Sequence, residues 1–139
     1  MKIGIVGAGQ VGASAAYAIA LLGKARDIVL IDLDPAMAAA QAEDISHAMP
    51  FAATTELRSG GYADLTEAEV VIIAAGVNQA PGETRLDLLA RNAAVFKEVT
   101  REVPTHAPEA LLLIASNPVD TMTVNTERPK GSASTPGTG

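Results

Sequence analysis

The hydrophobic pattern of the chain switches repeatedly between short apolar runs and longer segments with helical spacing. Runs that predict strands lie at 2–6, 27–31, 69–75 and 110–115, and the last two are uninterrupted, as in parallel strands buried on both faces. Strands that alternate with helices in this way predict a doubly wound α/β fold with a parallel sheet. Helical spacing is clearest after the first run, in Val11, Ala15, Ala18, Ile19 and Leu22.

Turn and capping residues mark where the other helices and strands in the first half of the chain begin and end. Gly23 is placed to end the first helix. Asp34 followed by Pro35 is typical of a cap and the first residue of a helix, which is expected over 36–48. A further short strand is expected at 54–59, before a pair of glycines.

The second half of the chain predicts a loop and a long helix. Residues 76–83 are rich in turn formers, and the helix is expected over 84–103. Pro104 and Pro108 are expected to interrupt or end it. Its apolar side comprises Leu89, Ala93, Phe96 and Val103.

The first predicted strand runs into three glycines with the spacing G-x-G-x-x-G, at Gly7, Gly9 and Gly12. Gly7 permits a sharp turn, the missing Cβ of Gly9 lets a pyrophosphate approach the backbone, and Gly12 allows close helix packing. The following helix would present free N–H groups and the positive end of its dipole to the phosphates. Asp32 lies 20 residues after Gly12, where a carboxylate can bind a ribose 2′-hydroxyl and would repel a 2′-phosphate. The pattern predicts a dinucleotide site that favours NAD over NADP.

The alternative for the three glycines alone is a tight βαβ turn without a ligand, because glycine is common in turns. The strand before the turn, the helix after it and the acid at the expected distance favour the dinucleotide site. No arginine follows Asp32 closely in the sequence to bind a 2′-phosphate.

Composition narrows the class of protein. The chain has 139 residues, of which 48% are hydrophobic and 19% charged, enough for one globular domain with a core of its own. A net charge of −6 argues against nucleic acid as a partner, and the absence of cysteine excludes disulfides and thiolate chemistry. The sequence contains no signal peptide, membrane-spanning run or metal-binding pattern, so a soluble, cytoplasmic protein is expected.

Ligands of doubly wound sheets bind beyond the carboxyl ends of the strands, near the point where the strand order reverses. Three segments are expected to converge there: the glycine turn, residues 75–85 and residues 116–120. The polar candidates in the last two segments are Gln79, Glu83, Arg85 and Asn117.

Longer motifs follow one another in the order GAGQVG, LID, AEDISHAMPF, AAGVNQAPGETRLDLLARN and ASNPVD. Together they resemble the lactate/malate dehydrogenase family, and more closely its L-lactate dehydrogenases. The resemblance covers residues 1–120 and implies the family's N-terminal, Rossmann-type NAD-binding domain in incomplete form.

The resemblance implies which residues would contact NAD. They lie on the glycine turn, after the second strand, near the pair of glycines and after the two uninterrupted strands. They are Gly7, Gly9, Val11 and Gly12 at the pyrophosphate, Asp32 at the adenosine ribose, Tyr62, Gly76 and Val77 along the adenosine and ribose, and Asn117 near the nicotinamide.

Three positions carry the implied substrate chemistry, hydride transfer between NADH and pyruvate. Gln79 resembles a residue that accompanies lactate in the family, where an arginine accompanies malate, because a second carboxylate needs a cation. Arg85 resembles the loop arginine that swings over the substrate and would stabilise charge on the carbonyl oxygen. Asn117 resembles an asparagine that hydrogen-bonds the substrate. From the residues alone, Gln79 is a solvated loop residue and Arg85 a helix-start arginine paired with Glu83 or Asp87.

Asp44 and His47 lie three residues apart on the predicted helix over 36–48 and share a face. Spacing alone favours a solvated ion pair, whereas the resemblance implies a helix packed between subunits of a homo-oligomer. His106 is expected in a Pro-flanked connection. Neither histidine stands in the context of the family's catalytic histidine, which belongs with a second arginine to a second domain, so both are expected at the surface.

Residues 121–139 have no periodicity and do not resemble the family, and they are expected to form a disordered tail. The sequence looks like a truncated domain whose last strand lacks a neighbour, so marginal stability and a tendency to associate are expected. Three functions stay open: an L-lactate dehydrogenase that is inactive without its substrate domain, a malate dehydrogenase that carries Gln79, and an NAD-binding module without turnover.

Overall fold

A computed structural model describes residues 1–49, 54–76 and 80–115 of the chain. A parallel sheet of five strands, in the order β3-β2-β1-β4-β5, forms its centre. The strands are β1 (Lys2–Val6), β2 (Asp27–Ile31), β3 (Glu56–Ser59), β4 (Val70–Ile73) and β5 (Leu111–Ile114). Each lies within a predicted run, and the predicted doubly wound sheet is confirmed. The strand order reverses between β1 and β4, where such sheets bind ligands.

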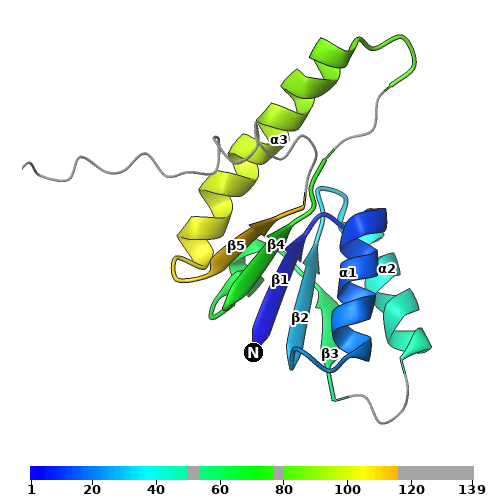
Figure 1. The fold of residues 1–139 in the computed structure, drawn as a ribbon, viewed down its shortest axis with the longest axis vertical. Helices are drawn as coiled ribbons and strands as arrows, with labels where there is room; N and C mark the ends of the chain where they lie inside the picture. The colour runs from blue at the N-terminus through cyan, green and yellow to red at the C-terminus, as the bar shows by residue number, and fades with distance from the viewer. Residues whose placement is uncertain (50–53, 77–79, 116–139) are drawn as a thin grey trace, which may run out of the picture.

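Helices cover both faces of the sheet (Figure 1). α1 (Gln10–Leu21) and α2 (Pro35–Ala48) pack on one face, whereas α3 (Arg85–His106) and the short 3-10 helix η1 (Tyr62–Leu65) pack on the other. In the core between the sheet and α1 and α2, the helices contribute mainly small alanine side chains. In the core on the other face, Phe96 and branched aliphatic side chains fill the space. Among the described residues, none of the helices combines the length and the apolar character needed to cross a membrane.

The ends of the first two helices follow from local sequence, as predicted. Past the end of α1, Gly23 adopts a φ of +63°, and the N–H of Lys24 donates to the carbonyl of Ile19 at 3.1 Å. Asp34 caps α2 because its carboxylate accepts from the N–H of Ala36 at 3.1 Å.

The C-terminus of α3 corrects two predictions. The helix continues through Pro104 to His106, which is therefore its last residue rather than part of a connection. The missing N–H of a proline affects little in a last turn that packing holds, since Val103 is fully buried and its carbonyl accepts from the N–H of Ala107 at 2.8 Å. His106 Nε2 lies 3.6 Å from a carboxylate oxygen of Glu102.

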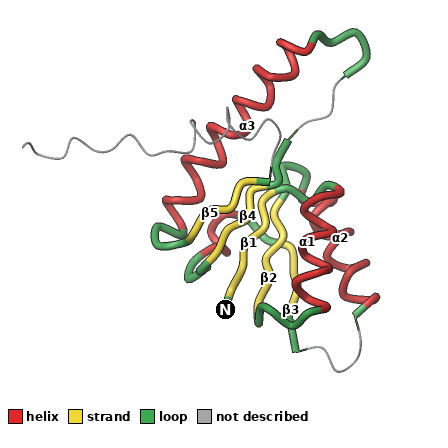
Figure 2. The backbone as a smooth tube through the Cα atoms, viewed as in Figure 1, coloured by secondary structure: helices red, strands yellow, loops and turns green. Residues whose placement is uncertain are grey.

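The two edges of the sheet differ in polarity. β3 exposes the charged Glu56 and Arg58, which discourage pairing with another strand. β5 is apolar throughout, yet Leu111 and Leu113 are 61% and 47% exposed, so the expectation that this strand is buried on both faces is wrong. In the described part of the chain no helix covers β5 on the α1 side (Figure 2). The expected tendency to associate stays a prediction.

Candidate functional site

A crevice of about 560 Å³ opens at the carboxyl ends of the central strands, beside the reversal of strand order. This volume lies within the range of small-molecule sites, roughly 300–1,000 Å³. The glycine turn, the ends of β2, β4 and β5, η1 and α3 all contribute to it. The lining residues are Val6, Gly7, Gly9, Gln10, Val11, Asp32, Leu33, Met37, Tyr62, Ala74, Ala75, Gly76, Asn92, Val95, Val99 and Ala115.

The three glycines of the turn have different structural roles. Gly7 has a φ of +110°, and a Cβ on it would lie 2.6 Å from the carbonyl of Ala74. A Cβ on Gly12 would collide with the carbonyl oxygen of Gly7, so this residue serves helix packing and does not itself line the crevice. Gly9 lines the crevice, and a Cβ on it would have no atom within 4 Å. Gly7 and Gly12 therefore make the turn, and Gly9 leaves space in front of it.

The N-terminus of α1 faces this space. Gly9 is its N-cap, and within the described part of the chain no side-chain cap accepts a hydrogen bond from the first turn. Gln10 and Val11 are exposed and line the crevice. Because the first N–H groups of a helix have no partner within the helix, they and the helix dipole form a site suited to an anion.

Asp32 closes the crevice on the β2 side. Its Oδ2 accepts from the N–H of Ala8 at 2.7 Å, and its Oδ1 accepts from the N–H of Asp34 at 2.9 Å. The carboxylate is half-buried and lines the crevice. None of the described residues that line the crevice is lysine or arginine, so this rim carries a negative charge without a cation beside it.

Tyr62 begins η1 and also lines the crevice. Burial, together with the nearby carboxylates of Glu98 and Glu102, raises the pKa of Tyr62 to about 12. Its hydroxyl is therefore protonated at neutral pH and available as a hydrogen-bond donor.

The loop side of the crevice is described only in part. Gly76 lines the crevice, whereas Val77, Gln79 and Asn117 lie outside the described residues. Arg85 is the exposed first residue of α3 and is not part of the lining.

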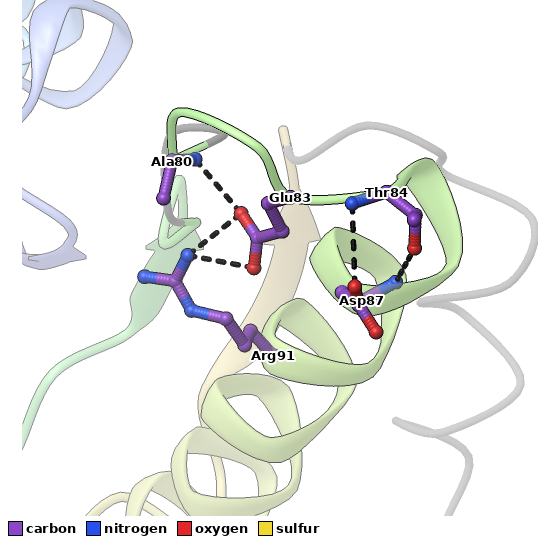
Figure 3. A network of polar contacts seen from close by, with 5 residues as sticks. All are labelled: Ala80, Glu83, Thr84, Asp87 and Arg91. Atoms are coloured by element: carbon purple, nitrogen blue, oxygen red, sulfur yellow. Dashed lines mark hydrogen bonds and ion pairs between the residues drawn. The ribbon is translucent and has the colours of Figure 1, made fainter.

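Glu83 is bound to the backbone of its own loop and to α3 (Figure 3). Its carboxylate accepts from the N–H of Ala80 at 2.8 Å and from the Nη1 of Arg91 at 2.9 Å. Those two bonds, in that order, lower the pKa of Glu83. The suggested pairing of Arg85 with Glu83 or Asp87 is wrong for the described residues, because Arg91 is the ion-pair partner of Glu83 and Asp87 exchanges hydrogen bonds with Thr84.

Asp44 and His47 are both exposed on α2. No ion pair joins them or pairs either with another described residue, so the suggested solvated ion pair does not form. A subunit contact through this helix stays a prediction.

Several lining residues were not predicted. Asn92, Val95 and Val99 come from α3, where Asn92, Phe96, Val99 and Val103 form the buried face. A polar residue on that apolar face was a visible signal, since buried polar side chains need partners. The Asp32–Ala8 bond had no signal in the sequence, because it joins residues 24 positions apart.

A family model described as lactate/malate dehydrogenase, NAD binding domain, matches residues 1–135. The chain belongs to the lactate/malate dehydrogenase family. The match lies in the NAD-binding domain of that family, which agrees with the predicted Rossmann-type fold and cofactor. It runs beyond residue 120, and the boundary expected there, like the disordered tail, stays a prediction because 116–139 lie outside the described residues.

Relatives within the lactate/malate dehydrogenase family include both of its activities. The chain is 60% identical over 123 residues to an L-lactate dehydrogenase of Allorhizobium ampelinum and 61% identical to one of Thermus aquaticus, covering 88% of this chain and 40% of each relative. A minor L-lactate dehydrogenase from Enterococcus mundtii has a TM-score of 0.84 at 40% identity, covering 90% of this chain and 40% of that chain. A malate dehydrogenase from Archaeoglobus fulgidus in complex with NADH has a TM-score of 0.84 at 34% identity, covering 91% and 44%. The chain thus spans about two fifths of the length of these relatives.

Proposed function

We propose that this chain is the cofactor-binding part of an NAD-dependent L-lactate dehydrogenase, which interconverts pyruvate and L-lactate. The observation that carries the proposal is the Asp32 carboxylate on the rim of a crevice that also contains an uncapped helix N-terminus. About 60% identity to curated L-lactate dehydrogenases supports the choice of substrate within the family.

In this proposal the dinucleotide lies across the carboxyl ends of the strands. The diphosphate binds the first turn of α1 in the space in front of Gly9, helped by Val11. Asp32 accepts hydrogen bonds from the adenosine ribose and excludes a 2′-phosphate, since none of the described residues that line the crevice is a cation. Tyr62 and Gly76 line the adenosine and ribose, and Val77 and Asn117 are proposed to join them.

The substrate chemistry is proposed for Arg85, Gln79 and Asn117. NAD, when bound, supplies and accepts the hydride. The Arg85 guanidinium is proposed to move with its loop onto the substrate carbonyl and stabilise the negative charge that grows on oxygen. Gln79 is proposed to favour the methyl group of pyruvate over a second carboxylate, and Asn117 to hydrogen-bond the substrate.

The proposed enzyme also needs groups that these residues do not supply. A proton donor and a cation for the substrate carboxylate are proposed to come from a substrate domain. We further propose a cytoplasmic homo-oligomer with α2, including Asp44 and His47, in the subunit contact. Neither nucleic acid nor a membrane is proposed as a partner.

A malate dehydrogenase is the second candidate, because malate dehydrogenases are among the structural neighbours at TM-scores up to 0.84. The two candidates predict opposite preferences for an enzyme that carries this domain together with a substrate domain. Faster reduction of pyruvate than of oxaloacetate supports the lactate dehydrogenase, and the reverse preference supports the malate dehydrogenase.

Titration of the 139-residue chain with NADH and NADPH, followed by cofactor fluorescence, tests the cofactor site. We expect NADH to bind at least about tenfold more tightly than NADPH, because Asp32 would face the 2′-phosphate. A folded chain that binds neither cofactor contradicts the proposal.

The third function, an NAD-binding module without turnover, is proposed for this chain on its own. Binding of NADH with no reduction of pyruvate supports it. Reduction of pyruvate by the chain alone overturns the module and places complete catalytic machinery within these residues.

A further inference from the structure

The carboxylate of Asp32 joins two backbone segments at the rim of the crevice. Oδ2 accepts from the N–H of Ala8 at 2.7 Å and Oδ1 from the N–H of Asp34 at 2.9 Å. Ala8 is fully buried, so its N–H is shielded from water and depends on this carboxylate. We call the two bonds the Asp32 tether.

The tether does not act alone on the glycine turn. The N–H of Gly7 donates to the carbonyl of Ile31 at 2.7 Å. Two successive residues of the turn are therefore bonded to the end of β2, one to main chain and the next to a side chain. Only the second bond can be removed by substitution.

Hydrogen bonding within the turn decides which groups are left for a ligand. Because the N–H of Ala8 is directed to Asp32, the donors available to a diphosphate include those of the first turn of α1, at Gln10 and Val11. The backbone of residues 7–9 sets where this first turn begins. A side chain that fixes Ala8 thus also fixes the position of those donors.

We propose that Asp32 is a positioning residue for the diphosphate subsite, in addition to the ribose contact given above, on which this inference rests. The ribose and diphosphate subsites are then coupled through one carboxylate. A substitution of Asp32 that admits a 2′-phosphate also releases Ala8 and weakens binding of the diphosphate. Cofactor preference and diphosphate affinity cannot be changed independently at this position.

Simple electrostatics predicts the opposite sign for the diphosphate alone. Removal of a carboxylate from the rim of an anion site reduces repulsion, so inorganic pyrophosphate, which has no ribose, would bind more tightly. Loss of the tether predicts weaker binding of pyrophosphate, because the donors at the start of α1 are no longer held in place. The sign of the change therefore separates the two effects.

The test follows the amide resonances of Gln10 and Val11 in the ¹⁵N-labelled chain during titration with pyrophosphate. Asp34→Ala is the matched control, since it removes the same charge two residues away, from a carboxylate that caps α2 and does not contact the turn. We expect Asp34→Ala to leave the affinity unchanged or slightly higher, and Asp32→Ala to lower it about fivefold. Asp32→Asn keeps one acceptor oxygen and should lie between the wild type and Asp32→Ala. Unchanged or tighter binding in Asp32→Ala overturns the proposal.

The amide proton of Ala8 gives a readout that needs no ligand. In the wild-type chain and in Asp34→Ala its resonance should lie downfield, as for an amide proton bonded to a carboxylate, and in Asp32→Ala it should move upfield. If Asp32→Ala does not fold, Asp32→Asn decides, because a neutral amide oxygen accepts a weaker bond. An Ala8 resonance that moves in neither variant overturns the tether. A chain that shows these shifts but does not bind NADH overturns the proposed function and leaves the tether standing.

Discussion

The two sides of the crevice are held in place by different kinds of contact. On the β1–α1–β2 side the turn is bonded directly to the next strand, through Gly7 to Ile31 and Ala8 to Asp32, both at 2.7 Å. On the other side α3 is buried only from Asn92 onward, and its first turns extend beyond the sheet (Figures 1 and 2). The cofactor side is therefore built into the fold, whereas the loop side depends on a local ion pair. Substitutions in the two regions should therefore affect the stability of the chain and its binding of the cofactor to different degrees.

The largest effect is expected from the buried part of α3. Phe96 is fully buried, and Phe96→Ala should lower the free energy of unfolding by about 3–5 kcal/mol through lost burial and the cavity left behind. Leu86→Ala, on the same helix, should change it by less than about 0.5 kcal/mol, because Leu86 is 77% exposed. Urea unfolding followed by circular dichroism measures both. Equal losses of unfolding free energy in the two variants would contradict this, because they would mean that the first turns of α3 are buried in a contact.

The next effect concerns the cofactor side and uses one substitution at two glycines. Gly12→Ala places a Cβ against the carbonyl oxygen of Gly7 and should cost about 1–3 kcal/mol of stability. Gly9→Ala meets no atom and should leave stability within about 0.5 kcal/mol. Its Cβ enters the proposed diphosphate space, however, so NADH affinity should fall at least about tenfold. Thermal unfolding and NADH titration measure the two properties separately, and Gly9→Ala with full NADH affinity would remove the diphosphate from this space.

The same contrast explains which features could be predicted from the sequence. The β1–α1–β2 unit depends on neighbours in sequence: a short apolar run, three glycines, Gly23 and an acid after the second run. The signals that end each strand and helix act within a few residues, so the predicted and observed bounds agree closely. The prediction that Pro104 interrupts or ends the helix is wrong because the packing of Val103, a tertiary contact, decides how far α3 continues.

The functional residues were harder to predict from the sequence than the helices and strands. Asp32 was found from spacing, but its bond to Ala8 requires the register of β1 against β2. Tyr62 was predicted to contact the cofactor only from the family resemblance, since a tyrosine after two glycines carries no signal of its own. The Arg91–Glu83 pair joins residues eight apart across a turn into a helix, and the sequence offered Arg85 as a nearer partner.

A smaller effect is expected where the loop meets α3. In Glu83→Gln the ion pair with Arg91 is lost, and the Tm at neutral pH should fall slightly. The bonds from Ala80 and Arg91 lower the pKa of Glu83 below the ordinary glutamate value of about 4.5, so their contribution to stability is present above about that pH. It is lost as the pH falls through the lower pKa of the folded state. The Tm difference between wild type and Glu83→Gln should therefore shrink in acid.

A double-mutant cycle with Arg91→Ala checks that the Glu83 effect comes from the pair. The losses in Tm of Glu83→Gln and Arg91→Ala should not add in the double variant, because each removes the same interaction. Fully additive losses at neutral pH would show that Glu83 does not act through Arg91.

The smallest effect is expected at Arg85, and it tests the comparison most directly. Arg85 is exposed, has no ion pair among the described residues and does not line the crevice, so Arg85→Gln should leave stability unchanged and NADH affinity within about twofold. Gln10 lines the crevice at the uncapped end of α1, so Gln10→Ala is the variant on the cofactor side whose NADH affinity is compared with that of Arg85→Gln. The proposed role of Arg85 is in turnover alone, since a charge that forms on the substrate oxygen in the transition state is absent while only cofactor is bound. A large loss of NADH affinity in Arg85→Gln would mean that the loop side already contacts the cofactor, and the division between the two sides of the crevice would no longer hold.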